Sequence, residues 1–229
     1  MRLQTWIDSQ YENPRGIVGT YIGEKMVRQH RVEVDWTIEQ LQIQPNDCIL
    51  DLGCGAGDAL ARLLQTDGTV RVTGLDRSPT IVRSALRRNR AAVRGQRAAV
   101  VEGNIGTIPF QDEQFDRVFS IHTLYFWEDV PAVLAAIDRI LKPGGSFVIT
   151  YCDGKGGVNW DGIMAIVREQ LIPAASALGF IDVQERRGPD SRDYHTVAVT
   201  GRKASLTSSP ALPCHGYPAK SADDGDIEP

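Results

Sequence analysis

The sequence predicts an α/β fold built on a doubly wound, mostly parallel sheet, with helices on both faces and one antiparallel strand near the C-terminus. Short apolar segments typical of strands alternate with helical segments from residue 48 onward, and this alternation is typical of a parallel sheet covered on both sides. Two strand-like segments, 180–185 and 195–201, flank a short turn at Gly188-Pro189. A hairpin there makes one of them antiparallel.

The predicted core begins after Pro45-Asn46-Asp47, which interrupts helical periodicity. Ser78 and Pro79 are a helix N-cap and first-turn pair, and Lys142-Pro-Gly-Gly145 is expected to stop a helix. The predicted strands are 48–52, 70–75, 98–101, 115–121 and 146–151, followed by the two near the C-terminus. The predicted helices are 59–64, 78 to about 93, 130–141, 162–170 and a short one ending at Gly179.

Three regions follow from this pattern. Residues 1–44 are expected to form a helical lid or cap, because Val27, Val34, Ile38 and Leu41 recur at helical spacing. Residues 45–203 form the core. In residues 204–229, Ser, Pro, Ala and Asp dominate and hydrophobic periodicity disappears, which predicts a disordered tail.

Composition narrows the classes of function. The chain has 229 residues, of which 42% are hydrophobic and 24% charged, as in one ordinary globular domain with small additions. The net charge of −4 gives no general attraction to nucleic acid. No apolar run is long enough to cross a bilayer, and no secretory signal is visible. We therefore expect a cytoplasmic protein, monomeric or homodimeric.

The cysteines and histidines support no metal site. The four cysteines show no C-x-x-C pair, and the four histidines are scattered without a second ligand at metal-binding spacing. The cysteines are expected to be reduced thiols. The sequence thus predicts that no metal is bound.

The loop Asp51-Leu-Gly53-Cys54-Gly55-Ala-Gly57 lies between a predicted strand and a predicted helix. Glycines there allow a sharp turn and a close approach of the backbone to a ligand. Dinucleotide-binding loops have the spacing G-x-G-x-x-G, whereas here the third glycine is two residues after the second and an acid stands two residues before the first. An acid in this place suits a cationic ligand better than a phosphate.

Asp76 ends the second predicted strand, about 20 residues beyond the loop. A carboxylate in that place can accept hydrogen bonds from ribose hydroxyls, although it also neighbours a helix N-cap. The order strand, glycine loop, helix, strand and acid is more specific than either element alone. It predicts a Rossmann-like fold that holds a nucleoside.

Over residues 45–201 the chain resembles the class I methyltransferases that use S-adenosylmethionine (SAM), many of which act on small molecules. The resemblance implies that the glycine loop supports the methionine part of SAM, that Asp76 binds the ribose, and that the segment around Asn104 flanks the adenine. Many relatives have Asp where this chain has Asn104, whose carbonyl oxygen can still contact the adenine amino group. The matching pieces are Asp51–Gly57, 75–78, 102–110, 115–118 and 141–145. The implied SAM-binding residues are Asp51, Gly53, Cys54, Gly55, Gly57, Asp76, Arg77, Asn104, Ile105 and His122.

The segment Ser120-Ile-His122-Thr-Leu-Tyr125-Phe-Trp127 follows the fourth core strand, where open α/β sheets bind their ligands. His122 is the candidate general base; its alternative role is packing over the cofactor. Tyr125 and Trp127 are candidate acceptor-binding residues or anchors of the loop. Tyr11 and Tyr21, in the expected lid, are further candidates. Tyr194 and His195 rank lower.

The expected activity is transfer of the SAM methyl group to a small, partly apolar metabolite by in-line displacement. One alternative is an RNA or protein methyltransferase that uses an arginine face of the helix after Asp76, although a solvated helix face explains that pattern better. Another is a SAM-binding regulatory subunit without catalysis. A nicotinamide dehydrogenase is disfavoured by the glycine spacing. The residues of the arginine face are Arg83, Arg87, Arg90 and Arg94.

Overall fold

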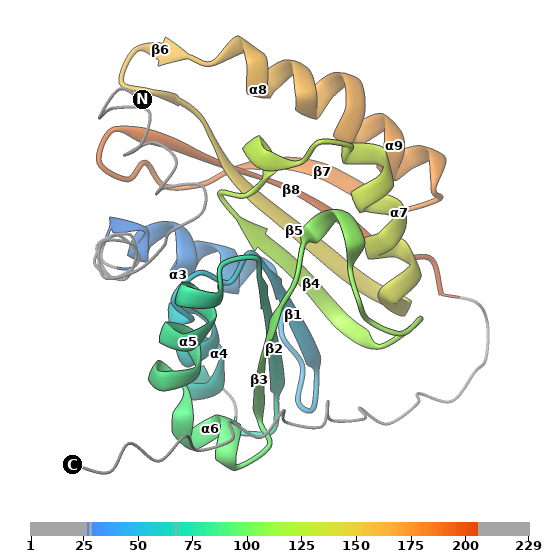
Figure 1. Cartoon of the computed structure of the whole chain (residues 1–229). Helices are drawn as coiled ribbons and strands as arrows, with labels where there is room; N and C mark the ends of the chain where they lie inside the picture. Colours follow the sequence, from blue (N-terminus) through green and yellow to red (C-terminus); the bar gives the residue numbers. More distant parts are fainter. Residues whose placement is uncertain (1–26, 28, 67, 206–229) are drawn as a thin grey trace.

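The computed structural model describes residues 27, 29–66 and 68–205 (Figure 1). Of the predicted lid, residues 1–44, the structure describes residue 27 and residues 29–44. Tyr11 and Tyr21 lie outside the described residues, as does nearly all of the predicted tail. Within the described residues, no helix combines the length and apolar character needed to cross a membrane.

A single mixed sheet forms the centre of the protein, with strand order β3-β2-β1-β4-β5-β8-β7. Neighbours from β3 to β5 pair in parallel, whereas β8 is antiparallel to both β5 and β7. This confirms the predicted mostly parallel sheet. A short additional strand, β6, pairs with the end of β5. The strands are β1 Cys48–Leu52, β2 Arg71–Asp76, β3 Ala98–Glu102, β4 Phe115–Ile121, β5 Leu141–Lys155, β6 Val158–Asn159, β7 Ile181–Arg187 and β8 Tyr194–Arg202.

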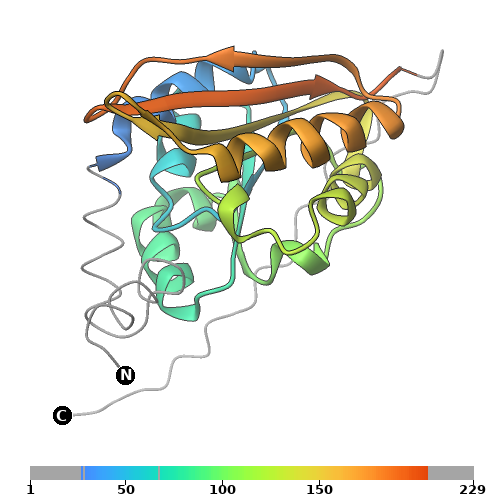
Figure 2. The ribbon, with the colours of Figure 1, turned by 90° about the horizontal axis from the view of Figure 1, so that it is seen from above.

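Helices cover both faces of the sheet, as Figures 1 and 2 show. Side chains alternate between the faces of a strand, and every residue of β1 is buried. Ile49 packs in a cluster with residues of α3 and α4, while Leu50 and Leu52 pack in a cluster with residues of α7 and α9. The helices are α3 Arg31–Gln40, α4 Asp58–Thr66, α5 Pro79–Arg88, α6 Arg90–Arg94, α7 Val130–Ile140, α8 Asp161–Ile166 and α9 Ile172–Ala177; single turns are η1 Ile105–Thr107, η2 Leu124–Phe126 and η3 Val167–Leu171.

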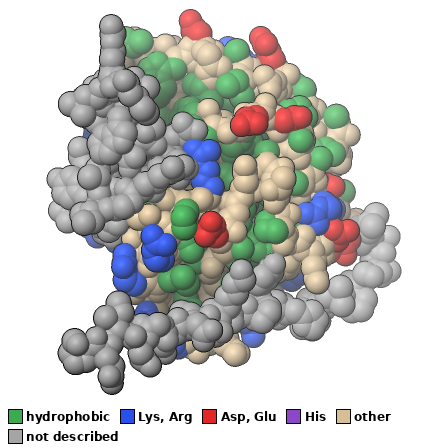
Figure 3. All heavy atoms as spheres, viewed as in Figure 1, with side chains coloured by type: hydrophobic (Ala, Val, Ile, Leu, Met, Phe, Trp, Pro, Cys, Tyr) green, Lys and Arg blue, Asp and Glu red, His purple; other side chains and the backbone are tan. Residues whose placement is uncertain are grey.

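The helix predicted from residue 78 to about 93 is two helices, α5 and α6, divided at Asn89. The Asn89 amide donates to the carbonyl oxygens of Ala85 (3.0 Å) and Gly57 (2.9 Å), so it both ends α5 and holds the glycine loop. The arginine row is interrupted there, because Arg83 and Arg87 belong to α5 and Arg90 and Arg94 to α6. Figure 3 shows basic side chains over α5 on a face of mixed character.

The segment Lys142-Pro-Gly-Gly145 belongs to β5, so the strand predicted at 146–151 is longer at both ends. Gly144 donates its N–H to the carbonyl oxygen of Lys203, and Lys203 donates to that of Gly145. Pairing with the chain beyond β8 therefore extends the strand through residues that were expected to form only a turn.

Two cysteines among the described residues, Cys54 and Cys152, are free and buried. Cys48 is disulfide-bonded, which corrects the expectation that all the cysteines are reduced.

Candidate active site

A cavity of about 490 Å³ lies at the carboxyl ends of β1, β2 and β4. This is where ligands bind to open α/β sheets. Its lining contains all the residues predicted to bind the cofactor except Gly57. The carbonyl oxygen of Gly57 accepts the Asn89 hydrogen bond, and a Cβ there would meet the Asn89 amide at 2.6 Å.

The glycine loop folds back against the end of β2. The N–H groups of Gly53 and Cys54 both donate to the carbonyl oxygen of Leu75, at 2.7 and 3.0 Å. Gly53 has φ +82°, and a Cβ there would overlap the Thr123 side chain. The first glycine is thus required by packing against the segment after β4.

Asp51, the last acid before the loop, is buried and is one of the residues that line the cavity. No side-chain hydrogen bond or ion pair joins it to the other described residues. Burial, followed by repulsion from the Asp76 carboxylate, raises the pKa of Asp51 well above its usual value. A cationic ligand would relieve both effects, because an opposite charge favours the ionised carboxylate.

Asp76 accepts two backbone hydrogen bonds, from Gly55 N to Oδ2 (3.0 Å) and from Ser78 N to Oδ1 (2.9 Å). Burial raises the pKa of Asp76, and these hydrogen bonds oppose the rise. Because a carboxylate oxygen has more than one lone pair, both oxygens keep acceptor capacity for hydroxyl donors at the cavity. This agrees with the predicted contact to a ribose.

Asn104 begins the turn η1, where its Oδ1 accepts a hydrogen bond from Gly106 N at 2.9 Å. The side chain is therefore already oriented, and its carbonyl oxygen keeps capacity for one further donor. Ile105, Arg77 and Cys54 also line the cavity. The contacts of these residues, and of Asp51 and Asp76, with individual parts of SAM stay predictions.

The segment after β4 divides into residues that line the cavity and one that anchors the chain. His122, Phe126 and Trp127 line the cavity, and Trp127 Nε1 donates to Thr123 Oγ1 at 3.0 Å. Tyr125 is outside the lining. Its hydroxyl donates to the Cys152 carbonyl oxygen and accepts from Cys152 N, which is the geometry of a loop anchor.

Tyr194 and His195, the lower-ranked candidates for the active site, do not line the cavity. His195 Nε2 contacts the carbonyl oxygen of Gly156 at 2.6 Å, and the Tyr194 ring packs against Lys155 and Arg192.

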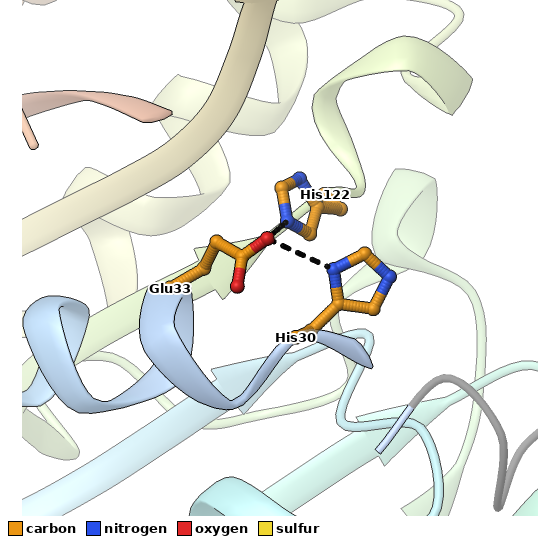
Figure 4. A group of neighbouring side chains, drawn as sticks. All are labelled: His30, Glu33 and His122. Carbon is orange, nitrogen blue, oxygen red and sulfur yellow. Dashed lines mark ion pairs between the residues drawn. The ribbon is translucent and has the colours of Figure 1, made fainter. Parts of the chain in front are cut away.

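The structure also assembles a charged cluster that the sequence did not reveal, formed by His30, Glu33, His122 and Arg192. Glu33 Oε1 lies 3.5 Å from His30 Nδ1, 3.9 Å from His122 Nε2 and 3.4 Å from Arg192 Nη2 (Figure 4 shows the first three residues). One sequence feature could have indicated Glu33, namely an acid on the buried face of a helix. Glu33 neighbours Val34 and precedes Thr37 by one turn.

The pKa values within this cluster follow from burial and pairing. Burial raises the pKa of Glu33, but the neighbouring His122 and His30 side chains outweigh this effect, so the net pKa is far below the usual value. Burial lowers the pKa of His122, and Glu33 partly opposes this. At neutral pH we therefore expect an ionised Glu33 beside a neutral His122.

The cluster also has the composition of a metal site, since His30, Glu33 and His122 offer ligand atoms within 4.8 Å of one another. However, the Arg192 guanidinium contacts Glu33 Oε1 and lies 3.5 Å from His30 Nδ1. A guanidinium thus already provides the positive charge at this point. The absence of a bound metal stays a prediction.

Comparison with known proteins agrees with this geometry. Residues 50–149 match the family model described as a methyltransferase domain. An uncharacterized methyltransferase, YdaC, of Bacillus subtilis is 30% identical over 70% of this chain and 86% of its own length. A 2-phytyl-1,4-naphtoquinone methyltransferase of Trichormus variabilis is 34% identical, but the match covers only 53% of each chain.

The fold has solved counterparts. A putative methyltransferase in complex with the Haloferax volcanii Trm112 methyltransferase activator superposes with a TM-score of 0.66. It is 23% identical, and the match covers 82% of this chain and 95% of the other. With SAM as the cofactor that the cavity fits, the chain belongs to the class I SAM-dependent methyltransferases.

Proposed function

We propose that this methyltransferase acts on a small, partly apolar metabolite bound beside the segment after β4. The observation that carries the proposal is the character of this wall. Phe126, Trp127 and Val133 give it apolar surface, while His122 supplies a titratable nitrogen. The naphtoquinone-specific relative supports an acceptor with an apolar part.

SAM supplies a methyl group on a positively charged sulfonium. We propose that Asp51 faces the cationic methionine end, that Asp76 accepts hydrogen bonds from the ribose, and that Asn104 and Ile105 flank the adenine. The enzyme then needs to hold the acceptor in line with the methyl–sulfur bond and exclude water.

His122 is the proposed general base. A base is needed when the acceptor atom carries a proton that it must lose. His122 lines the cavity, and its lowered pKa leaves the imidazole neutral at physiological pH. We assign Phe126 and Trp127 to the acceptor, and Tyr125 to the support of their loop. Tyr11 and Tyr21 stay predicted acceptor contacts.

Calorimetric titration with SAM and S-adenosylhomocysteine, followed by an acceptor screen with radiolabelled SAM, tests the proposal. We expect binding of both nucleosides and methyl transfer to an aromatic or isoprenoid compound. Lack of binding would refute the proposal. Binding without transfer to any small molecule, RNA or protein would instead identify a regulatory subunit. Transfer to RNA or protein alone would favour a methyltransferase that binds such a substrate through the arginine-rich helices α5 and α6.

Location and assembly are further parts of the proposal. A cytoplasmic enzyme agrees with the free thiols of Cys54 and Cys152, whereas the Cys48 disulfide does not support that location, because disulfides are rare in reducing compartments. A monomer or homodimer is the predicted assembly, which sedimentation can test.

A further inference from the structure

Glu33 is a carboxylate buried behind the wall of the cavity. Its side chain is 0% exposed, and Oε2 has no hydrogen-bond partner among the described residues. His30 and His122 line the cavity, whereas Glu33 does not. Buried acids are rarely left with such sparse contacts, so the arrangement calls for a functional explanation.

The distance between Glu33 and His122 is set by one residue of β5, Thr150. Thr37 Oγ1 donates to the Glu33 carbonyl oxygen at 2.7 Å and lies 2.7 Å from Thr150 Oγ1. The backbone N–H of His122 donates to the Thr150 carbonyl oxygen at 2.8 Å. Helix α3 and the end of β4 are thus tied to the same point, which holds the two side chains face to face.

The His122 imidazole has one buried and one accessible nitrogen. Nε2 is buried, has no hydrogen-bond partner within 3.5 Å, and faces Glu33 (Figure 4). Nδ1 makes no hydrogen bond with the other described residues. It is not one of the buried atoms that lack a partner, so it is the accessible nitrogen. The backbone of His122 has φ +57°, a left-handed conformation that is strained for a non-glycine residue.

We infer that Glu33 is a positioning residue that holds His122 with Nε2 protonated, so that the lone pair of Nδ1 faces the acceptor. This inference rests on the proposed role of His122. Ligand binding must shorten the 3.9 Å separation, as is common for catalytic hydrogen bonds.

The proposed reaction moves one methyl group and one proton. As the acceptor oxygen or nitrogen bonds to the methyl carbon, the methyl–sulfur bond breaks and leaves its electron pair on sulfur. The acceptor proton passes to Nδ1 of His122. The resulting imidazolium lies beside the Glu33 carboxylate, which offsets the new charge.

Three charged or titratable groups face His122, namely Glu33 and His30 from α3 and its N-terminal end, and Arg192 from the β7–β8 hairpin. Glu33 raises the pKa of His122, while His30 and Arg192 lower it. Removing the charge of Glu33 should therefore shift the pKa downward, and removing that of Arg192 should shift it upward.

The test compares Glu33→Gln in the full chain with Asp35→Asn, an exposed acid on the same helix that pairs with Arg62. Imidazole nitrogen signals are titrated by NMR, with His122 assigned from its loss in His122→Gln. We expect a lower His122 pKa in Glu33→Gln alone. The acid limb of the kcat/KM profile should move to lower pH, and kcat should fall about 10- to 100-fold, while the Kd for SAM stays constant. Glu33→Asp should restore part of kcat.

An unchanged His122 pKa in Glu33→Gln, or an equal shift in Asp35→Asn, would overturn the inference. If Glu33→Gln does not fold, Arg192→Gln gives the second reading, because this exposed substitution should raise the His122 pKa, and an unchanged value would refute the coupling. If the wild-type chain transfers no methyl group, the proposed function fails, but the NMR titration still reports on the Glu33–His122 contact.

Discussion

Two acids at the cavity are ionised with difficulty in the absence of a ligand. Burial raises the pKa values of both Asp51 and Asp76. When folding raises the pKa of a carboxyl group, the folded protein loses stability as the pH rises from the unfolded-state pKa of the group to its folded-state pKa. At neutral pH the folded protein therefore has a stability penalty at the place where we propose that the cationic end of SAM binds.

Asp51→Asn separates stability from binding. We expect a higher melting temperature at pH 7, because the neutral amide avoids the penalty, and an affinity for SAM lower by about 10- to 100-fold, since a charged contact contributes about 1.5–3 kcal/mol. Thermal unfolding and calorimetry measure the two effects. Asp47→Asn, at a buried acid outside the cavity lining, should leave SAM affinity unchanged. Equal SAM affinity in Asp51→Asn would contradict the assignment.

His122 contributes a pH-dependent term of the opposite sense. Its pKa is lowered by burial, so the unfolded chain binds a proton more readily than the folded protein. The free energy of unfolding should therefore fall as pH decreases through about 6.5, the unfolded value. His122→Asn lacks this term. In urea unfolding at pH 7.5 and 5.5, the variant should gain stability relative to wild type at the lower pH; a constant difference would argue against a buried neutral His122.

Residues that bind through a local motif could be predicted from sequence, and residues that meet across the fold could not. The spacing of Asp51 and the glycines identified the loop, because its members are neighbours in the chain. Glu33 and His122 are 89 positions apart by their residue numbers and meet through the packing of α3 on the sheet, where Thr150 contacts both segments. No local pattern contains that information.

At the scale of elements, the division between α5 and α6 supports the cofactor loop. The Asn89 side chain ends one helix and bonds to Gly57 in the turn before another. Helical periodicity predicts one continuous helix here. The break depends on a partner 32 residues away, and that partner is set by tertiary structure.

Asn89→Ala should lower the free energy of unfolding by about 1–3 kcal/mol, because the carbonyl oxygens of Gly57 and Ala85 each lose a side-chain donor and a hydrogen bond contributes about 0.5–1.5 kcal/mol. SAM affinity should also fall, since the loop loses its support. Urea unfolding and calorimetry report these effects. Gln65→Ala, at an exposed position of α4, is the control and should change neither quantity appreciably. A loss of stability with full SAM affinity would show that the loop does not depend on Asn89.

Strand β5 is longer than predicted, also because of a contact between distant parts of the chain. Its centre was predicted from apolar residues, but its extension through Lys142-Pro-Gly-Gly145 depends on pairing with Lys203. Proline and glycine indicate a turn by local preference. Long-range pairing overrode this preference, which is why the strand begins at Leu141 and not at Ser146.

At the scale of the whole molecule, the arrangement of the sheet was predictable because hydrophobic patterning is repeated along the chain. The alternation of strands and helices gave the parallel part, and the turn after β7 gave the antiparallel strand. The cluster behind the cavity was not predictable, since it combines α3, β4 and the β7–β8 hairpin.

Ligand binding should stabilise the whole fold. SAM at 100 times its Kd adds about 2.7 kcal/mol to the free energy of unfolding, which corresponds to a rise in melting temperature of about 5–10 °C for a chain of this size. Differential scanning fluorimetry with increasing SAM measures it. The rise should be much smaller for Asp51→Asn at the same SAM concentration, and a SAM-independent melting temperature in wild type would contradict the assigned site.

Thr123 connects the two halves of the cavity. It packs against Gly53 in the cofactor loop, and its hydroxyl accepts the hydrogen bond from Trp127 on the acceptor wall. A ligand that shifts Thr123 from one side therefore changes the energy of a contact on the other. Thermodynamic reciprocity requires that such coupling be equal in both directions. Whatever SAM does to the affinity for the acceptor, the acceptor does equally to the affinity for SAM, so the contacts of one side chain can couple the binding of the two ligands.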